Sequence, residues 1–161
     1  MKRITATAIG IVLAAGLAIA SPQSTATDLV TRYYATTSEA DLAATWGDWH
    51  PGATHHIEIK TGIKDGDFAF SYAMFDWENL PDWTAEPEIM EAMKGYEETG
   101  RSDPNLTISA EGTDTIVTAQ SKVAYVWDGY KGAMTQTDRF TIATTAGRAV
   151  IRDLTTLYDY R

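Results

Sequence analysis

The spacing of apolar residues in the first third of the chain predicts two helices. One run falls at positions i, i+3, i+4, i+7 and i+8, namely Ala26, Leu29, Val30, Tyr33 and Tyr34. Residues at this spacing share one face of a helix. A second run at helical spacing contains Leu42, Trp46 and Trp49. We therefore expect helices over residues 26–37 and 39–48, the second ended by the turn-forming sequence His50-Pro51-Gly52.

The pattern then changes to strict alternation, which predicts strands. Ile57, Ile59 and Ile63 alternate with polar residues, and a second alternating series contains Phe68, Phe70, Tyr72 and Met74. The dipeptide Asp65-Gly66 lies between the two series and is typical of a hairpin turn. We expect antiparallel strands over residues 54–63 and 67–76.

The second half of the chain predicts one further helix and four strands. The helix is expected over residues 86–99, because Ile89, Met90, Met93 and Tyr96 share a helical face and Gly100 follows. Alternating and β-branched residues then fill residues 105–160, with turns at Gly112, Asp128-Gly129 and Ala146-Gly147. This order predicts an α+β fold, with three helices packed on a strongly curved, mostly antiparallel six-stranded sheet.

The first twenty residues have the features of a secretory signal peptide. Residues 1–3 are basic, residues 4–20 are apolar, and Ala18-Ile19-Ala20 before Ser21 fits a cleavage site. A membrane anchor is the alternative, but the apolar run is short for a span and contains two glycines. We expect a periplasmic or secreted protein with a single domain over residues 21–161.

Charge and composition exclude several classes of function. The formal charge is −9, and losing Lys2 and Arg3 with the signal peptide would bring it to −11. A chain this acidic, without clustered lysine or arginine, is not expected to bind nucleic acid or, after cleavage, a membrane surface. The absence of cysteine excludes disulfides, thiolate catalysis and cysteine-ligated zinc.

The clustering of histidines raises the question of a metal site. His50, His55, His56 and Glu58 lie close together in the sequence. Adjacent residues of a strand face opposite sides, so His55 and His56 cannot easily share one ion. We therefore expect neither a metal nor a cofactor.

Three segments of the chain resemble the nuclear transport factor 2-like superfamily, which includes SnoaL-like and ketosteroid-isomerase-like proteins. They are Leu29-Val30-Thr31-Arg32-Tyr33-Tyr34-Ala35, the passage from His50 to His56, and Thr137-Asp138-Arg139-Phe140-Thr141-Ile142. The resemblance covers about Asp28 to Asp159 and implies a cone-shaped domain with a central pocket. This superfamily contains isomerases, cyclases, dehydratases, hydrolases and binding modules, so the fold alone does not choose a function.

The isomerase branch of the family implies two candidate catalytic residues. There, a tyrosine of the first helix and an aspartic acid of a late strand donate hydrogen bonds to a developing enolate. Tyr33 matches the tyrosine because it follows Arg32, and Asp138 matches the acid because it lies two positions before Phe140. The alternatives are a structural core tyrosine and an Asp138 carboxylate paired with an arginine such as Arg139 or Arg152.

The catalytic base of the isomerase branch does not carry over, because its position falls at Ile57. His56 and Glu58 flank this position, and strand alternation turns both away from the side of Ile57 unless a bulge intervenes. His56 remains a candidate general base for another reaction. Its alternative is a polar side chain on the solvent-facing side of the strand.

Aromatic residues supply the candidate binding residues. The chain has five tryptophans and eight tyrosines, and the candidates for a pocket wall are Trp46, Tyr72, Trp77, Tyr125 and Trp127. The alternative is a bulky core. We expect a small, mostly apolar molecule in the central pocket, with acid–base chemistry of isomerase, cyclase or hydrolase type. The alternative function is a non-catalytic interaction module that forms a homodimer through its sheet.

Overall fold

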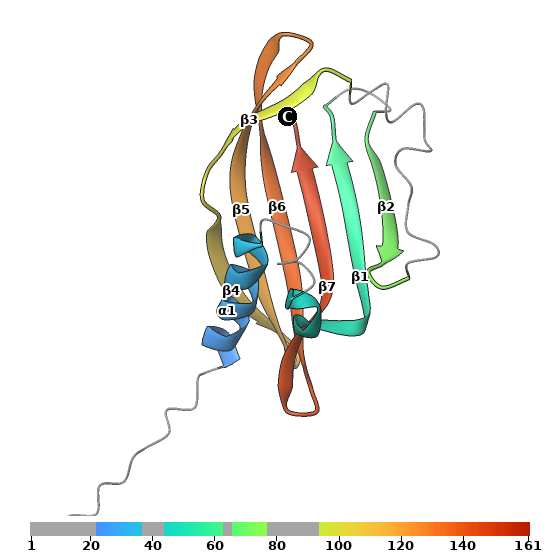
Figure 1. The fold of residues 1–161 in the computed structure, drawn as a ribbon, viewed down its shortest axis with the longest axis vertical. Coiled ribbons are helices and arrows are strands. Elements are labelled where there is room, and N and C mark those ends of the chain that lie inside the picture. Colours follow the sequence, from blue (N-terminus) through green and yellow to red (C-terminus); the bar gives the residue numbers. More distant parts are fainter. Residues whose placement is uncertain (1–21, 37–43, 63–65, 77–93) are drawn as a thin grey trace, which may run out of the picture.

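The computed structural model describes residues 22–36, 44–62, 66–76 and 94–161. Within these segments, one α-helix and a short 3-10 helix lie beside a seven-stranded sheet (Figure 1). The helices are α1 (Pro22–Ala35) and η1 (Trp46–Asp48). The strands are β1 (Trp49–Lys60), β2 (Phe68–Ala73), β3 (Tyr96–Arg101), β4 (Asn105–Glu111), β5 (Asp114–Trp127), β6 (Tyr130–Thr145) and β7 (Arg148–Asp159).

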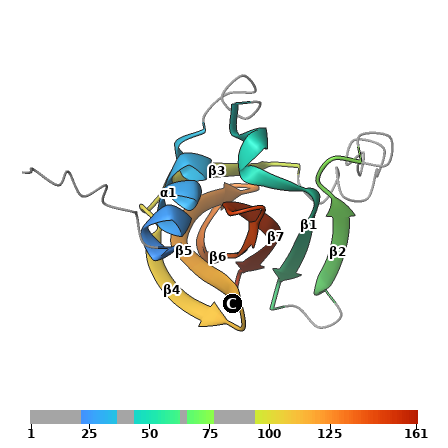
Figure 2. The ribbon, with the colours of Figure 1, turned by 90° about the horizontal axis from the view of Figure 1, so that it is seen from below.

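The sheet joins two antiparallel units through one parallel pair. Its strand order is β2-β1-β7-β6-β5-β3, and β4 also pairs with β5. Strands β4 to β7 form an antiparallel meander, as the sequence predicted, and β1 and β2 form the predicted antiparallel pair. Strands β1 and β7 run parallel to each other. Figure 2 shows how strongly the sheet curves when it is seen from below.

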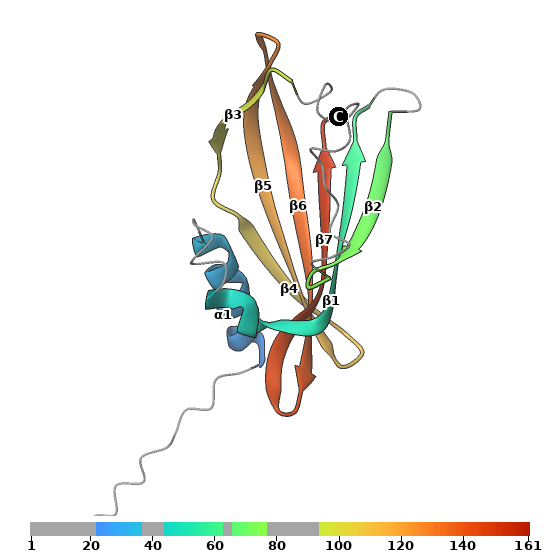
Figure 3. The same ribbon diagram turned by 45° about the vertical axis from the view of Figure 1, so that its right-hand side comes forward.

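Helix α1 lies against one face of the sheet, beside β4 and β5 (Figure 3). We call the face that contacts α1 the inner face and the opposite one the outer face. The buried helix residues Ala26, Leu29 and Val30 belong to the same apolar cluster as Phe140 of β6 and Leu154 of β7. Since the helix presents a stripe and the strands present alternate residues, the two periods meet in one core.

The predicted helix over residues 86–99 is wrong at its C-terminal end. Lys94 and Gly95 form a turn, and Tyr96–Arg101 is strand β3, paired with β5. Gly95 has a φ of +78°, and a Cβ atom there would lie 2.2 Å from the Asp128 side chain. The positive φ favours glycine, and this left-handed backbone does not continue a helix. Residues 86–93 lie outside the described segments.

The sheet therefore has seven strands instead of six, and several predicted boundaries shift. The first helix covers residues 22–35 instead of 26–37, with Pro22 at its first turn, where proline is tolerated. Strand β1 begins at Trp49 instead of residue 54, and an irregularity between Trp49 and Thr54 accommodates Pro51. Of the helix expected at 39–48, only residues 44–48 lie within the described segments, and these are helical.

Two further predictions fall partly or wholly outside the described segments. The expected signal peptide at 1–20 is one of them, and Trp77 is the other. Within the described segments, no helix combines the length and the apolar character needed to cross a bilayer.

Candidate functional site

A buried carboxylate lies at the centre of the inner face. Asp138 of β6 is only 2% exposed, and it lies between Ala119 of β5 and Thr156 of β7. The Tyr34 hydroxyl of α1 donates to its Oδ2 at 2.5 Å, and the Gln136 amide donates to the same oxygen at 2.8 Å. The Thr156 hydroxyl donates to Oδ1 at 2.7 Å. Three donors directed at one carboxyl group compensate for its loss of water.

The hydrogen-bond chain continues from Thr156 across two more strands. His55 of β1 places Nε2 2.9 Å from the Thr156 hydroxyl and Nδ1 2.8 Å from the Tyr72 hydroxyl of β2. Thr156 gives its single proton to Asp138, so it must accept from His55 Nε2. His55 Nδ1 then accepts from Tyr72. With Asp138 ionised, this geometry places the proton of a neutral His55 on Nε2.

Burial favours the same neutral state of His55. Loss of water lowers the pKa of His55 to about 4, even though the negative charge of Asp138 acts in the opposite direction. The pKa values of Tyr33 and Tyr34 are raised, first by burial and then by the Asp138 charge. Both phenols therefore remain protonated and able to donate at neutral pH.

A second branch connects Asp138 to a cation. The Arg101 guanidinium of β3 donates to Gln136 Oε1 at 2.6 Å, which fixes the Gln136 amide with its NH₂ group toward Asp138. Arg101 also makes two hydrogen bonds with Glu98, at 2.9 and 2.8 Å. The forked contact holds the guanidinium plane in one orientation.

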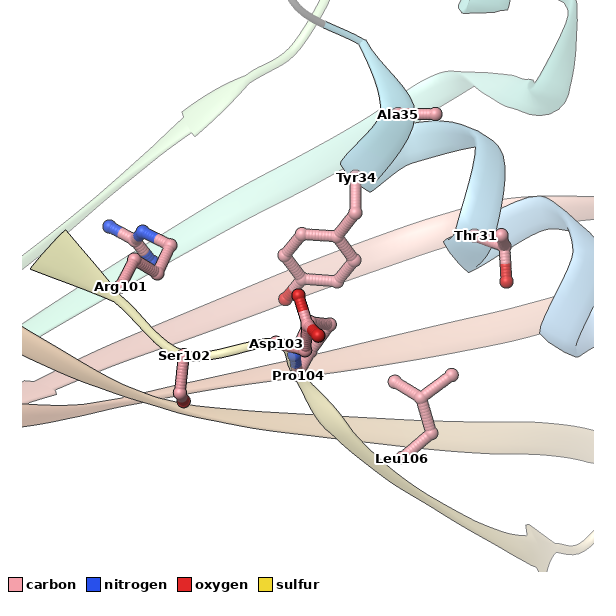
Figure 4. Close-up of a pocket in the computed structure, with 8 residues that line it drawn as sticks. All are labelled: Thr31, Tyr34, Ala35, Arg101, Ser102, Asp103, Pro104 and Leu106. Atoms are coloured by element: carbon pink, nitrogen blue, oxygen red, sulfur yellow. The ribbon is translucent and has the colours of Figure 1, made fainter.

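A pocket of about 410 Å³ lies between α1 and the connection from β3 to β4 (Figure 4). Its lining residues are Thr31, Tyr34, Ala35, Arg101, Ser102, Asp103, Pro104 and Leu106. Figure 4 shows the Tyr34 ring reaching from the helix to the centre of this group. Both Tyr34 and Arg101 are thus pocket-lining residues that connect to the buried Asp138, the first directly and the second through Gln136.

The structure brings Asp138 together with Tyr34, the neighbour of the predicted Tyr33. The Tyr33 ring packs edge-on against Phe140 at 5.2 Å and against Trp49 at 6.0 Å. Tyr33 thus contributes mainly to the aromatic core, which was the alternative interpretation of this residue. An Asp138 ion pair with Arg139 or Arg152 does not form, because these guanidinium groups pair with Glu111 and with Asp114 and Asp153.

His56 lies on the outer face, away from Asp138. Its Nδ1 contacts the Ser71 hydroxyl at 2.7 Å and its Nε2 contacts Glu58 at 3.3 Å. No bulge turns it inward, since β1 and β2 pair in continuous register from Thr54 to Ile59. The histidine that joins the network is His55, which the alternation of β1 places on the same face as Ile57.

The structure brings Tyr125 and Trp127 together, but not with Trp46. Tyr125 and Trp127 join Tyr96 and Tyr160 in an aromatic cluster with ring centroids 5.5 to 6.4 Å apart. Rings this close pack against one another, so no ligand fits between them. Trp46 lies in η1 and is 45% exposed, whereas Tyr72 belongs to the Asp138 network through His55.

Sequence reasoning missed Tyr34, His55, Thr156, Gln136 and Arg101. A signal existed for His55, because it lies two positions before Ile57 and therefore shares its face. Strand alternation likewise places Gln136 on the face of Asp138. Among the described residues, no three histidine, aspartate or glutamate side chains form a group able to hold a metal ion.

Comparison with known proteins identifies the fold. No family model and no curated protein matches the sequence. Among solved structures, the chain is similar to a Novosphingobium aromaticivorans protein assigned as the beta subunit of an aromatic-ring-hydroxylating dioxygenase. The TM-score is 0.50 at 12% identity, over 85% of this chain and 88% of that one.

Two further structures are nuclear transport factor 2-like proteins. One comes from Cytophaga hutchinsonii, with a TM-score of 0.49 at 8% identity over 86% of this chain and 99% of that one. The other has a cystatin-like fold and comes from Novosphingobium aromaticivorans, with a TM-score of 0.48 at 14% identity over 84% and 80%. At identities this low, a structural likeness concerns the fold alone, and the TM-score reaches 0.50 for the dioxygenase beta subunit.

Proposed function

We propose that the protein binds a small, mostly apolar molecule in the pocket between α1 and the β3–β4 connection. The observation that carries this proposal is the connection of two pocket-lining groups, Tyr34 and Arg101, to the buried Asp138. A wall built on a buried, hydrogen-bonded carboxylate is held in place before any ligand arrives, which reduces the entropy lost on binding.

The size and lining of the pocket support this class of ligand. Small-molecule sites usually measure about 300–1,000 Å³ and combine apolar walls with a few fixed polar groups. This pocket, at about 410 Å³, falls within that range. Ala35, Pro104, Leu106 and the Tyr34 ring form its apolar surface, and the Arg101 guanidinium adds a cation. Asp103 also lines the pocket and Arg101 pairs with Glu98, so the expected ligand is a small, mostly apolar molecule that carries a hydroxyl group.

The polar groups behind the wall fit acid–base chemistry of isomerase, cyclase or hydrolase type. A tyrosine, a carboxylate and a histidine in one hydrogen-bonded series are groups that commonly give and take protons in enzymes. Tyr34 is the member that lines the pocket, and its raised pKa keeps the proton on its oxygen. Because this proton is donated to Asp138, we assign the Tyr34 oxygen the role of the acceptor that a ligand hydroxyl meets.

Binding of 2-naphthol tests the proposal, because this probe has an apolar body and one hydroxyl group. Titration followed by NMR should move the resonances of α1 and of residues 101–106. Ala35→Trp should abolish these shifts, since the indole would fill the pocket, whereas Gln23→Trp on the first turn of the same helix should not. Tyr34→Phe should weaken binding by about 1–3 kcal/mol, the cost of an unmade buried hydrogen bond. Binding that survives Ala35→Trp would contradict the proposal.

We also propose that the protein is exported and that residues 1–20 are removed. The support is the sequence of those residues, with its basic start, apolar run and small-residue cleavage site. Mass spectrometry of the exported protein should find Ser21 at its N-terminus. An intact Met1 on protein held in the membrane fraction would show that the segment is an anchor.

A further inference from the structure

We propose that Tyr72, His55 and Thr156 form a proton relay that connects the half-buried edge of the sheet at β2 with the buried Asp138. This inference concerns the protein without ligand, so it does not depend on the pocket between α1 and the β3–β4 connection. Its basis is the unbroken series of hydrogen bonds across β2, β1, β7 and β6, with heavy-atom distances of 2.8, 2.9 and 2.7 Å.

Each link of the series can both give and accept a proton. A tyrosine or threonine hydroxyl does so at a single oxygen, and a neutral imidazole gives from one nitrogen and accepts at the other. With Asp138 ionised, the direction runs from Tyr72 to His55 Nδ1, from His55 Nε2 to Thr156, and from Thr156 to Asp138. With Asp138 protonated, every bond can reverse and none is lost.

The reversal balances as the uptake of one proton. A proton from solvent binds the Tyr72 oxygen, whose own proton passes to His55 Nδ1. The proton on His55 Nε2 passes to Thr156 Oγ1, and the Thr156 proton passes to Asp138 Oδ1. Each intermediate group gains one proton and gives one away, so the net change is a neutral Asp138 and the other tautomer of His55.

The surroundings favour passage of the proton over its capture by His55. Burial disfavours the imidazolium form, and the neighbouring His56 adds a smaller effect in the same direction. The titratable or charged groups that act on Asp138 or its partners are Tyr33 and Tyr34 of α1, Tyr72 of β2, Arg101 of β3 and Tyr158 of β7. The phenols are neutral at physiological pH, and Arg101, whose guanidinium also pairs with Glu98, is the cation among these groups.

The same geometry argues against Thr156 as a nucleophile. An activating histidine must accept the hydroxyl proton, but His55 donates to Thr156 while Thr156 donates to Asp138. Thr156 is also only 2% exposed, so a substrate could not reach its oxygen. Its position between a histidine and a carboxylate suits transfer of a proton and not attack on a ligand.

Asp138→Asn tests the relay at neutral pH, because the amide imitates the protonated acid. The Gln136 NH₂ group, fixed by Arg101, requires the amide oxygen of the substituted residue on its side. The amide NH₂ must then face Thr156 and reverse the series. Nitrogen NMR of His55 should therefore show the proton on Nε2 in the wild type and on Nδ1 in Asp138→Asn. An unchanged tautomer would overturn the proposal.

Thr156 variants separate a relay from a purely structural contact. In a Thr156→Val background, the Asp138→Asn substitution should no longer change the His55 tautomer, whereas a Thr156→Ser background should restore the change. If Asp138→Asn does not fold, acid titration of the wild type decides. The relay predicts that the Asp138 carboxyl carbon and the His55 tautomer change together, and a proton that stays on His55 Nε2 while Asp138 becomes protonated would overturn it.

Discussion

Two adjacent histidines, His55 and His56, show how differently the two faces of the sheet use the same side chain. His55 points to the inner face, where it bonds Thr156 and Tyr72 within a network that ends on Asp138. His56 points to the outer face, where it contacts Ser71 and Glu58, and its side chain is 38% exposed. One step along a strand therefore separates a buried network from a solvent-exposed contact.

The difference between the faces reflects what each polar group exchanges for water. On the inner face, Asp138 and Thr156 have given up water completely and depend on their protein partners. On the outer face, pairs such as Arg139–Glu111 and Arg152–Asp153 keep much of their exposure. On the inner face, removal of one hydrogen-bond partner leaves a buried polar group unsatisfied. On the outer face, water replaces the lost partner.

Asp138→Ala should have the largest effect on stability, because it leaves the buried Thr156 hydroxyl and two part-buried donors without their acceptor. We expect the free energy of unfolding to fall by about 3–5 kcal/mol in urea denaturation. The outer-face control is Asp153→Ala, which loses contacts with Thr54 and Arg152 and should cost less than about 1 kcal/mol. Equal costs for the two variants would contradict the assignment of faces.

Acidification should distinguish the two histidines next. The pKa of His55 is lowered to about 4 in the folded protein, so the unfolded chain binds the extra proton first. Stability from this group is complete above the unfolded pKa near 6.5 and is lost as the pH falls toward 4. Because the His55 side chain is partly exposed, we expect the free energy of unfolding to fall by only on the order of 2 kcal/mol.

Denaturation at pH 7 and pH 4.5 measures this effect against two variants. His55→Gln should remove this part of the pH dependence, and His56→Ala should retain it, because His56 lies on the solvated face. The remaining acid sensitivity from carboxylates is common to both variants, so the difference between them isolates His55. A His56→Ala variant that loses the pH dependence would reverse the roles.

Thr156→Val and Thr155→Val make the same isosteric change on each face of the sheet. The first removes the hydroxyl that bonds both Asp138 and His55 and should cost about 1–3 kcal/mol. The second lies on the outer face, where valine suits a strand at least as well as threonine, and should change stability by less than about 0.5 kcal/mol. Thermal unfolding of both variants is sufficient to check this.

The smallest effect is expected from the exposed pair of His56 and Glu58. Glu58→Gln removes a 3.3 Å contact between side chains that are each more than one third exposed. We expect a change in unfolding free energy within about 0.5 kcal/mol at neutral pH, and a still smaller one in high salt. A cost comparable to that of Thr156→Val would show that this face is covered.

The meander could be predicted from sequence because its strands and turns carry independent signals. Residues 114–159 alternate in burial, and the turn at Asp128-Gly129 has φ angles of +49° and +83°, which this dipeptide readily adopts. Strand β3 carries neither signal. Glu97, Glu98 and Gly100 lie in a strand at the end of the strand order, so no buried alternation distinguishes it from a loop or a helix end.

The candidate site was only half predictable for a similar reason. Asp138 followed from a family resemblance, and strand alternation alone places His55 opposite to His56. The choice between Tyr33 and Tyr34 depends on the rotation of α1 over the sheet, because both belong to the apolar stripe. The partnership of His55 with Thr156 depends on the parallel register of β1 and β7, which no local pattern encodes.

The parallel pairing of β1 and β7 also has a consequence for how the chain folds. Thr54 and Asp153, which this pairing brings into contact, are 99 positions apart, so an early strand must wait for one of the last to be synthesised. The meander and the hairpin can each form from local contacts, but their union closes a long loop and is expected to be slow. His55 meets Thr156 only when β1 and β7 pair, so the proposed relay requires the completed sheet.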